Sequence, residues 1–118
     1  MKAGREANEV YLSLAVEHLR NAVRYARRGH DVFFDSANPD TLLLVEGELR
    51  KAYESLNRLG KSFRIANPTV EWDRVGEIRQ MLTHDYAEID REAVWEMVTE
   101  DAPALLRRAS RAKIPRSE

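Results

Sequence analysis

Apolar residues recur at steps of three and four along most of the chain, which is the spacing of one face of an α-helix. The first such stripe, within residues 10–26, consists of Leu12, Val16, Leu19, Val23 and Ala26. Gly29 then follows as a natural helix stop. A second stripe consists of Leu42, Val45, Leu49, Ala52, Leu56 and Leu59. The two stripes predict two helices, joined by a loop over residues 30–40 that contains Phe33 and Phe34.

The second half of the chain carries the same periodicity in shorter stretches. Residues 61–66 are expected to add a turn or two before Asn67-Pro68 breaks the chain. A third predicted helix, for which Thr69 is the expected N-cap, has the apolar face Trp72, Val75, Ile78 and Leu82. A fourth, with Asp90 as the expected N-cap, has the apolar face Ala93, Val94, Met97 and Val98.

A proline and the absence of strand patterns complete the prediction of the fold. Pro103 lies inside the last helical pattern and should kink that helix or split it at Asp101. No stretch alternates between apolar and polar residues as a half-buried strand does. We therefore predict an all-α fold, an up-and-down bundle of four to five helices in a single domain over residues 1–118. Residues 112–118 are expected to form a frayed basic tail.

Composition narrows the class of protein. A hydrophobic content of 43% and a charged content of 33% fit a globular helical protein. No apolar run approaches the ~18 residues of a membrane span, and the polar residues 1–6 exclude a secretory signal. The chain has no cysteine, which excludes disulfides and thiolate chemistry and fits the reducing cytoplasm in which we expect the protein.

The charge distribution matters more than the net charge of −1, because nucleic-acid binding would have to rely on local basic patches. One candidate RNA-binding stripe on the first predicted helix consists of Arg20, Arg24, Arg27 and Arg28. The alternative is a solvated face paired with Glu17 or Asp31. A second basic cluster, near the C-terminus, consists of Arg107, Arg108, Arg111, Lys113 and Arg116. It could bind RNA or an acidic partner, or favour the negative end of the last helix.

The candidate chemistry is concentrated in the pattern Arg79-x4-His84-x-Tyr86. Arginine offers a fixed fork of donors that matches phosphate oxygens. Histidine exchanges a proton near neutral pH, and tyrosine adds a phenolic hydroxyl. On one continuous helix Arg79 and His84 would point about 140° apart. They can converge only if the helix ends or distorts near Thr83, or if a second subunit contributes one of them.

Each of these residues also has an ordinary structural explanation. Arg79 could be a surface residue paired with Glu71 or Asp85. His84 could be a helix-end histidine bonded to the backbone, and Tyr86 a packing residue with a wet hydroxyl. A metal site is disfavoured, since the grouping of His84, Asp85 and Glu88 is a weak signal. We expect no metal and no cofactor.

The wider pattern resembles a known family. Residues from about Leu42 to Leu106 are similar to the HepT-like branch of the HEPN superfamily. The matching elements, in order, are Trp72, Arg79-x4-His84-x-Tyr86, Ile89-Asp90, Val94-Trp95-x2-Val98 and Asp101-x-Pro103-x-Leu105. Gln80 departs from the family, which often has asparagine after the arginine. Glu54 lies where the family often has a glutamate in its second helix.

The resemblance implies a fold, an activity and a partner. It implies a helical bundle that forms a homodimer and acts as a metal-independent endoribonuclease toxin on RNA. Arg79 and His84 would be the catalytic residues, while Gln80 and Tyr86 would support and position the phosphate. An MNT-type nucleotidyltransferase antitoxin would neutralise the toxin by adenylylating Tyr86. The alternative is a non-catalytic HEPN subunit that binds a nucleotide or a nucleotidyltransferase partner.

Overall fold

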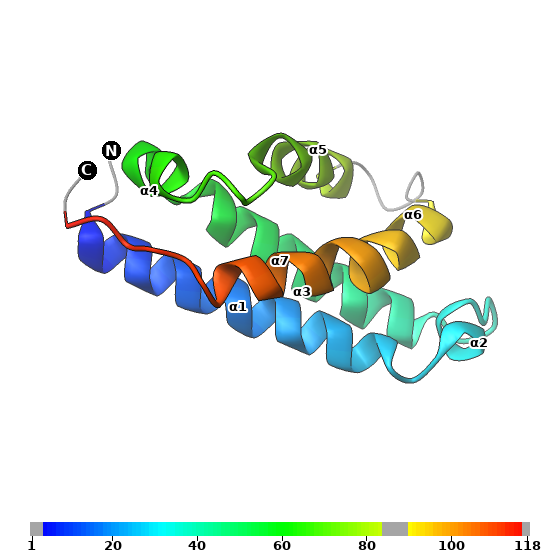
Figure 1. Ribbon diagram of the computed structural model, residues 1–118. Helices are drawn as coiled ribbons and strands as arrows, with labels where there is room; N and C mark the ends of the chain where they lie inside the picture. The colour runs from blue at the N-terminus through cyan, green and yellow to red at the C-terminus, as the bar shows by residue number, and fades with distance from the viewer. Residues whose placement is uncertain (1–3, 84–89, 117–118) are drawn as a thin grey trace.

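The computed structural model describes residues 4–83 and 90–116, and the regular elements in these ranges are all helical. They are α1 (Arg5–Ala26), α2 (His30–Phe33), α3 (Asp40–Asn57), α4 (Lys61–Ala66), α5 (Trp72–Leu82), α6 (Arg91–Glu96), a π-helical turn (Met97–Asp101) and α7 (Ala102–Ala109). The predicted all-α fold is confirmed (Figure 1). None of the described helices is long and apolar enough to cross a membrane.

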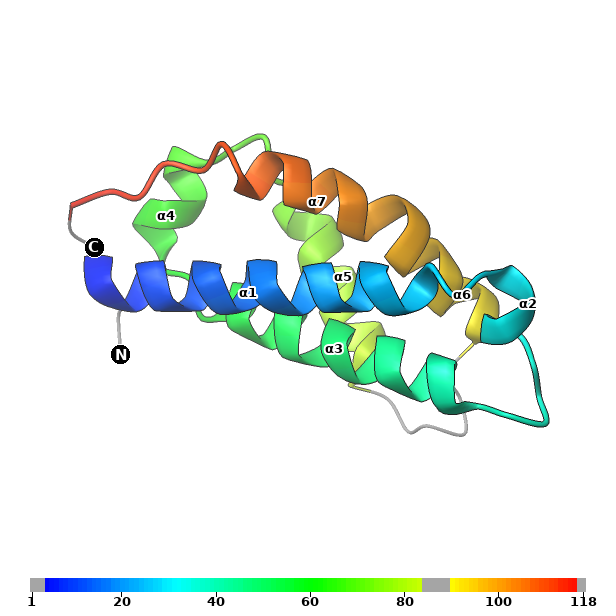
Figure 2. The same cartoon turned by 90° about the horizontal axis from the view of Figure 1, so that it is seen from below.

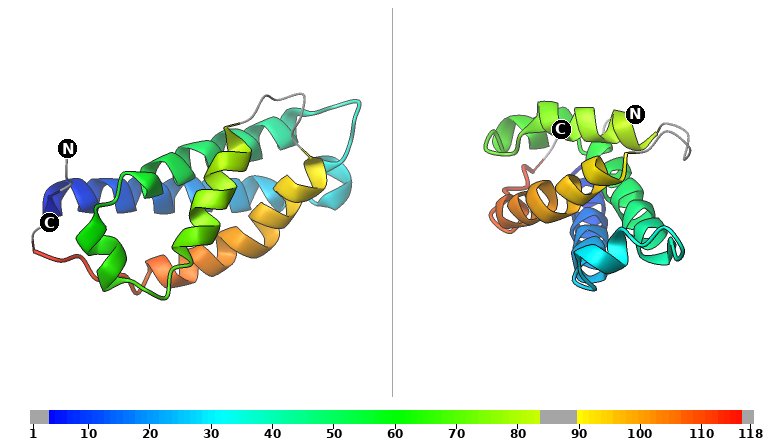
Figure 3. Two further views of the ribbon diagram at one scale, coloured as in Figure 1. Left: turned by 90° about the horizontal axis from the view of Figure 1, so that it is seen from above. Right: turned by 90° about the vertical axis from the view of Figure 1, so that its right-hand side faces the viewer.

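The helices form an elongated body of 49 × 25 × 20 Å. Antiparallel helices α1 and α3 make the most extensive helix pair (Figure 2). The continuous run from α6 through the π-helical turn to α7 packs along α1. Helix α5 crosses over α3, and α4 and α5 together form one side of the molecule (Figure 3). Within residues 4–83 and 90–116 the long segments are α1, α3, α5 and the run from α6 to α7, which agrees with the predicted four to five helices, while α2 and α4 are short additions.

The core between α1 and α3 is built partly from alanines. In α1 the fully buried residues are Ala15, Leu19 and Ala22, whereas the expected core residues Leu12, Val16 and Val23 are only half-buried. In α3 the predicted positions Val45, Leu49 and Ala52 are fully buried. The buried face of α1 is rotated relative to the predicted stripe because small side chains allow closer helix packing.

Two predicted boundaries need correction. Residues 30–33 form a helical turn, α2, where a loop was expected. Phe33 at its end is fully buried, with its ring centroid 5.0 Å from that of Trp95, so aromatic packing holds the turn in place. Thr69 is exposed and is not the N-cap of α5, which begins at Trp72 after Glu71. The Trp72 indole nitrogen donates to the Asn67 carbonyl oxygen at 3.1 Å and anchors this helix start.

Two expected features of the C-terminal helical run are the Asp90 cap and an irregularity caused by Pro103. Asp90 does cap α6, since its carboxylate accepts from the Glu92 amide at 2.9 Å. The irregularity expected before Pro103 is present as a π-helical turn at Met97–Asp101, which interrupts the α-helical run before α7 begins at Ala102. Proline lacks an N–H and its ring clashes with the carbonyl four residues earlier, and a wider turn relieves both problems.

The expected frayed tail is held against the body of the molecule as far as Ile114. The Lys113 amide donates to the Asn67 side-chain oxygen at 2.8 Å, and the Asn67 amide nitrogen donates to the Lys113 carbonyl at 2.7 Å. Arg5 also donates to the Ile114 carbonyl at 2.5 Å. The buried side chain of Asn67, which is distant in the sequence, fixes this segment by hydrogen bonds. The residues of the segment itself therefore could not predict that it is ordered.

Candidate active site

Arg79 lies on the last turn of α5. Its neighbours Ile78 and Leu82 are buried against the core and fix the rotation of the helix about its axis. The Arg79 side chain is consequently directed toward α3 and remains 38% exposed. A guanidinium in this position is both anchored and accessible to a ligand.

The partner of Arg79 is Glu54 on α3. The Arg79 Nε donates to the Glu54 carboxylate at 2.8 Å. The two Nη nitrogens donate to no acceptor within residues 4–83 and 90–116, so the end of the fork is available to bind an anion. This pairing replaces the expected one with Glu71, which lies 3.8 Å from Arg108 instead. Asp85, the other expected partner, lies outside the described residues.

Helix α5 ends immediately before the motif histidine. The Thr83 amide donates to the Arg79 and Gln80 carbonyls at 3.1 and 3.3 Å, and its hydroxyl donates to the Gln80 carbonyl at 2.8 Å. The helix end near Thr83, one of the two arrangements that would let the motif converge, is therefore present. Gln80 itself is exposed. His84 and Tyr86 lie outside the described residues.

A second charged pair on α3 precedes Glu54 along the same helix. Glu46, Arg50 and Glu54 recur every four residues and therefore share one helix face. The Glu46 carboxylate is almost fully buried and accepts two hydrogen bonds from Arg50, at 2.7 and 3.1 Å. The sequence reasoning missed Glu46 and Arg50. The spacing Glu-x3-Arg-x3-Glu within an apolar helix is the signal that could have found them.

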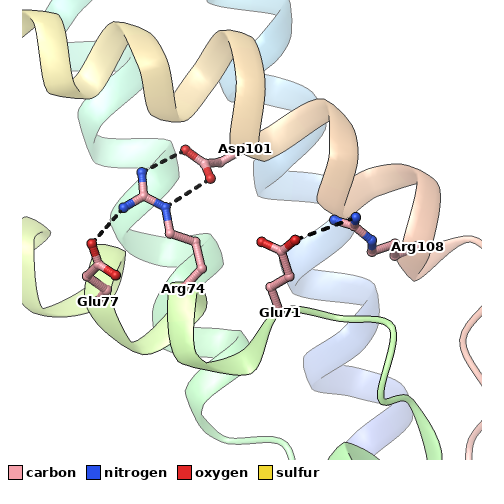
Figure 4. A network of polar contacts seen from close by, with 5 residues as sticks. All are labelled: Glu71, Arg74, Glu77, Asp101 and Arg108. Carbon is pink, nitrogen blue, oxygen red and sulfur yellow. Dashed lines mark hydrogen bonds and ion pairs between the residues drawn. The ribbon is translucent and has the colours of Figure 1, made fainter.

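A second polar network fixes the other half of α5 (Figure 4). Arg74 donates through two nitrogens to the Asp101 carboxylate, both at 3.0 Å, and to Glu77 at 2.9 Å. Asp101 belongs to the π-helical turn, so this ion pair ties α5 to the C-terminal helix. Tyr53 is buried beside it. Burial raises the pKa of the Tyr53 phenol, and the negative charge of Asp101 raises it further.

The arginine stripe on α1 has a different character. Arg20, Arg24, Arg27 and Arg28 are exposed. The guanidinium groups of Arg24 and Arg28 each lie 5.3 Å from the centre of the Tyr25 ring. Neither Glu17 nor Asp31 is within ion-pair distance of these arginines in the part of the chain that the structure describes. The same part holds no group of three acidic or histidine side chains placed to bind a metal.

Comparison of the sequence with known protein families identifies the family of this chain. The model of the family described as ribonuclease HepT-like matches residues 15–112, most of the chain. The chain belongs to the ribonuclease HepT-like family. No solved structure matches it significantly. The family match covers α3, α5 and the C-terminal helical run of this HepT-like chain, so it contains Arg79, Glu54 and the motif segment.

Proposed function

We propose that this HepT-like protein is a metal-independent endoribonuclease that uses Arg79 and His84. The observation that carries the proposal is the position of Arg79. Its Nε is held by Glu54, and its two Nη nitrogens have no acceptor among the described residues, one turn before the helix end that precedes His84. Membership of a ribonuclease family supports RNA as the substrate.

The proposed reaction uses the nucleophile that RNA itself carries. His84 removes the proton from a 2′-hydroxyl, whose oxygen attacks the adjacent phosphorus. The bond from phosphorus to the 5′-oxygen breaks, and that oxygen takes a proton from an imidazolium, in a dimer the second His84. Arg79 binds the non-bridging oxygens and stabilises the charge that develops on them. The products are a 2′,3′-cyclic phosphate and a free 5′-hydroxyl.

Regulation forms the second part of the proposal. Gln80 and Tyr86 position the phosphate or the histidine, in a cleft formed by two protomers. An MNT-type nucleotidyltransferase antitoxin adenylylates Tyr86 and so adds bulk and negative charge where RNA phosphate must bind. The protein would then be the toxin of a toxin–antitoxin pair.

The deciding experiment is cleavage of a mixed RNA pool by purified protein in EDTA, beside the His84→Ala variant. Mass spectrometry must first show that Tyr86 is unmodified, since an adenylyl group would itself block cleavage. We expect cleavage that survives the chelator and disappears in the variant. If the His84→Ala protein cleaved RNA as fast as wild type, the proposed mechanism would be wrong.

A non-catalytic subunit is the second candidate, and the Arg79–Glu54 ion pair favours it. A carboxylate 2.8 Å from the guanidinium opposes the approach of a phosphate to the same group. In that case the protein would bind a nucleotide or a nucleotidyltransferase partner without cutting RNA. Absence of cleavage by folded, unmodified dimer, together with measurable binding to a nucleotidyltransferase, would establish this alternative.

A further inference from the structure

A basic hollow lies at the opposite end of α5 from Arg79. It has a volume of about 680 Å³ and is lined by Ala66, Asn67, Pro68, Thr69, Arg108, Arg111 and Lys113. One wall is the loop between α4 and α5, and the other is the end of α7 with the segment that follows it. Figure 3 shows these two segments side by side, although they are far apart in the sequence.

Asn67 holds the two walls together. Its side chain is buried and exchanges two hydrogen bonds with the backbone of Lys113, at 2.7 and 2.8 Å. It also donates to the Phe63 carbonyl at 2.8 Å. The backbone that carries the basic side chains is therefore fixed at the rim of the hollow, which reduces the conformational entropy lost when they bind a ligand.

Among the described residues, few carboxylates compensate the positive charge of the hollow. Arg111 and Lys113 are exposed, and no carboxylate within residues 4–83 and 90–116 is at ion-pair distance from either. Arg108 has one carboxylate neighbour, Glu71, at the long distance of 3.8 Å (Figure 4). Two cations without an ion-pair partner among the described residues, a weakly paired arginine and the Thr69 hydroxyl form a donor set suited to phosphate oxygens.

We propose that this hollow binds backbone phosphates of the RNA strand away from the bond that is cut, an inference that rests on RNA being the substrate. Helix α5 connects the two positions, and it rises about 10 Å from Trp72 to Arg79. The Arg74–Asp101 ion pair fixes that helix against the C-terminal run. One strand could therefore engage the hollow and the candidate active site together.

Favourable placement of cations at the C-terminal end of α7 is the competing explanation for this cluster. That effect acts within the last turn of a helix. Helix α7 ends at Ala109, with Arg107 and Arg108 in its last turn. Of the three cations that line the hollow, only Arg108 is in that turn, since Arg111 and Lys113 lie beyond the helix. The helix dipole would affect stability, whereas a phosphate site would affect RNA binding.

The test is binding of a single-stranded 2′-O-methyl RNA, which lacks the free 2′-hydroxyl needed for cleavage. It compares wild type, the double variant Arg111→Gln/Lys113→Gln, and the control Arg58→Gln/Lys61→Gln. The control removes the same charge from exposed residues outside the hollow. Losing two phosphate contacts should weaken binding and reduce the slope of log affinity against log salt by about 1.4. The control should retain the wild-type slope.

Further arms separate this inference from the proposed catalysis. The hollow variant should cut a dinucleotide as fast as wild type does, but show a raised KM on a longer strand. Unchanged affinity and slope in the hollow variant would overturn the inference, as would an equal loss in the control. If AMP bound in the hollow with the same affinity as the RNA strand, the hollow would be a nucleotide pocket and the inference would be overturned. In a further outcome, the wild-type protein binds RNA but fails to cut it, while the hollow variant still shows the reduced slope of log affinity against log salt. That result would support phosphate binding in the hollow and contradict the proposed nuclease activity.

Discussion

At the scale of single residues, the pairing of Arg79 with Glu54 defines the candidate site. Both side chains are more than a third exposed, so their ion pair contributes little to stability, of the order of 0–1 kcal/mol. Its geometric effect is larger, because holding Nε fixes the direction in which the two Nη nitrogens point. Glu54 therefore acts in the proposed reaction as a positioning residue for Arg79.

Replacing Glu54 by alanine should separate activity from stability. Freed Arg79 would sample other rotamers, and we expect kcat to fall by roughly tenfold to a hundredfold, as misplaced catalytic groups generally cause. The melting temperature should stay close to that of wild type. The matched control is Glu17→Ala, which removes an exposed carboxylate from α1 and leaves α3 and α5 unchanged. Wild-type kcat in the Glu54 variant would contradict the positioning role.

The raised pKa of Tyr53 predicts that the free energy of unfolding decreases at alkaline pH. The unfolded chain releases the phenolic proton near pH 10, about the ordinary tyrosine pKa. Burial, reinforced by Asp101, raises the pKa of Tyr53 in the folded protein. The contribution of this proton to stability is complete below pH 10 and is lost as the pH rises above it. Above pH 10, urea unfolding should show a steeper decline for wild type than for Tyr53→Phe, by at most about 1.4 kcal/mol per pH unit. Equal slopes would contradict this.

At the scale of elements, the ends of helices position the chemistry. Helix α5 ends at Leu82 and α6 begins at Arg91 behind the Asp90 cap, so the motif segment connects two helix ends. The loop between α4 and α5 also fixes the segment after α7, because the side chain of its buried Asn67 is hydrogen-bonded to the backbone of Lys113. The loop that contains Asn67 thus fixes the basic hollow.

Asn67→Ala should release the segment after α7. It removes hydrogen bonds to Phe63 and Lys113, and we expect a loss of about 1–3 kcal/mol in the free energy of unfolding. Trypsin should also cut faster after Arg111 and Lys113. Asn57→Ala, at an exposed position at the end of α3, serves as the control. Unchanged proteolysis in the Asn67 variant would show that other contacts hold the segment.

At the scale of the whole molecule, the proposed dimer has a testable consequence. If one active site combines Arg79 of one protomer with His84 of the other, two inactive variants should complement each other. Mixing Arg79→Ala with His84→Ala protein would give heterodimers in which one site has both groups intact. We expect RNA cleavage to reappear on mixing under conditions that exchange subunits. No recovery, with heterodimers shown by mass spectrometry, would place the site within one protomer.

The sequence by itself determined the helical fold, most helix positions and the family. Helical periodicity is a local property, so the stripe from Leu42 to Leu59 and the Asp90 cap could be predicted from neighbouring residues. The Arg79-x4-His84-x-Tyr86 pattern likewise identifies candidate chemistry without a structure.

The tertiary structure decided which groups meet. The pairing of Arg79 with Glu54 joins α5 to α3, and that of Asn67 with Lys113 joins residues from opposite ends of the second half of the chain. Close packing with α3 also selected Ala15 and Ala22 over Leu12 and Val16 as the core of α1. These outcomes depend on distances between helices, which no local pattern of residues encodes.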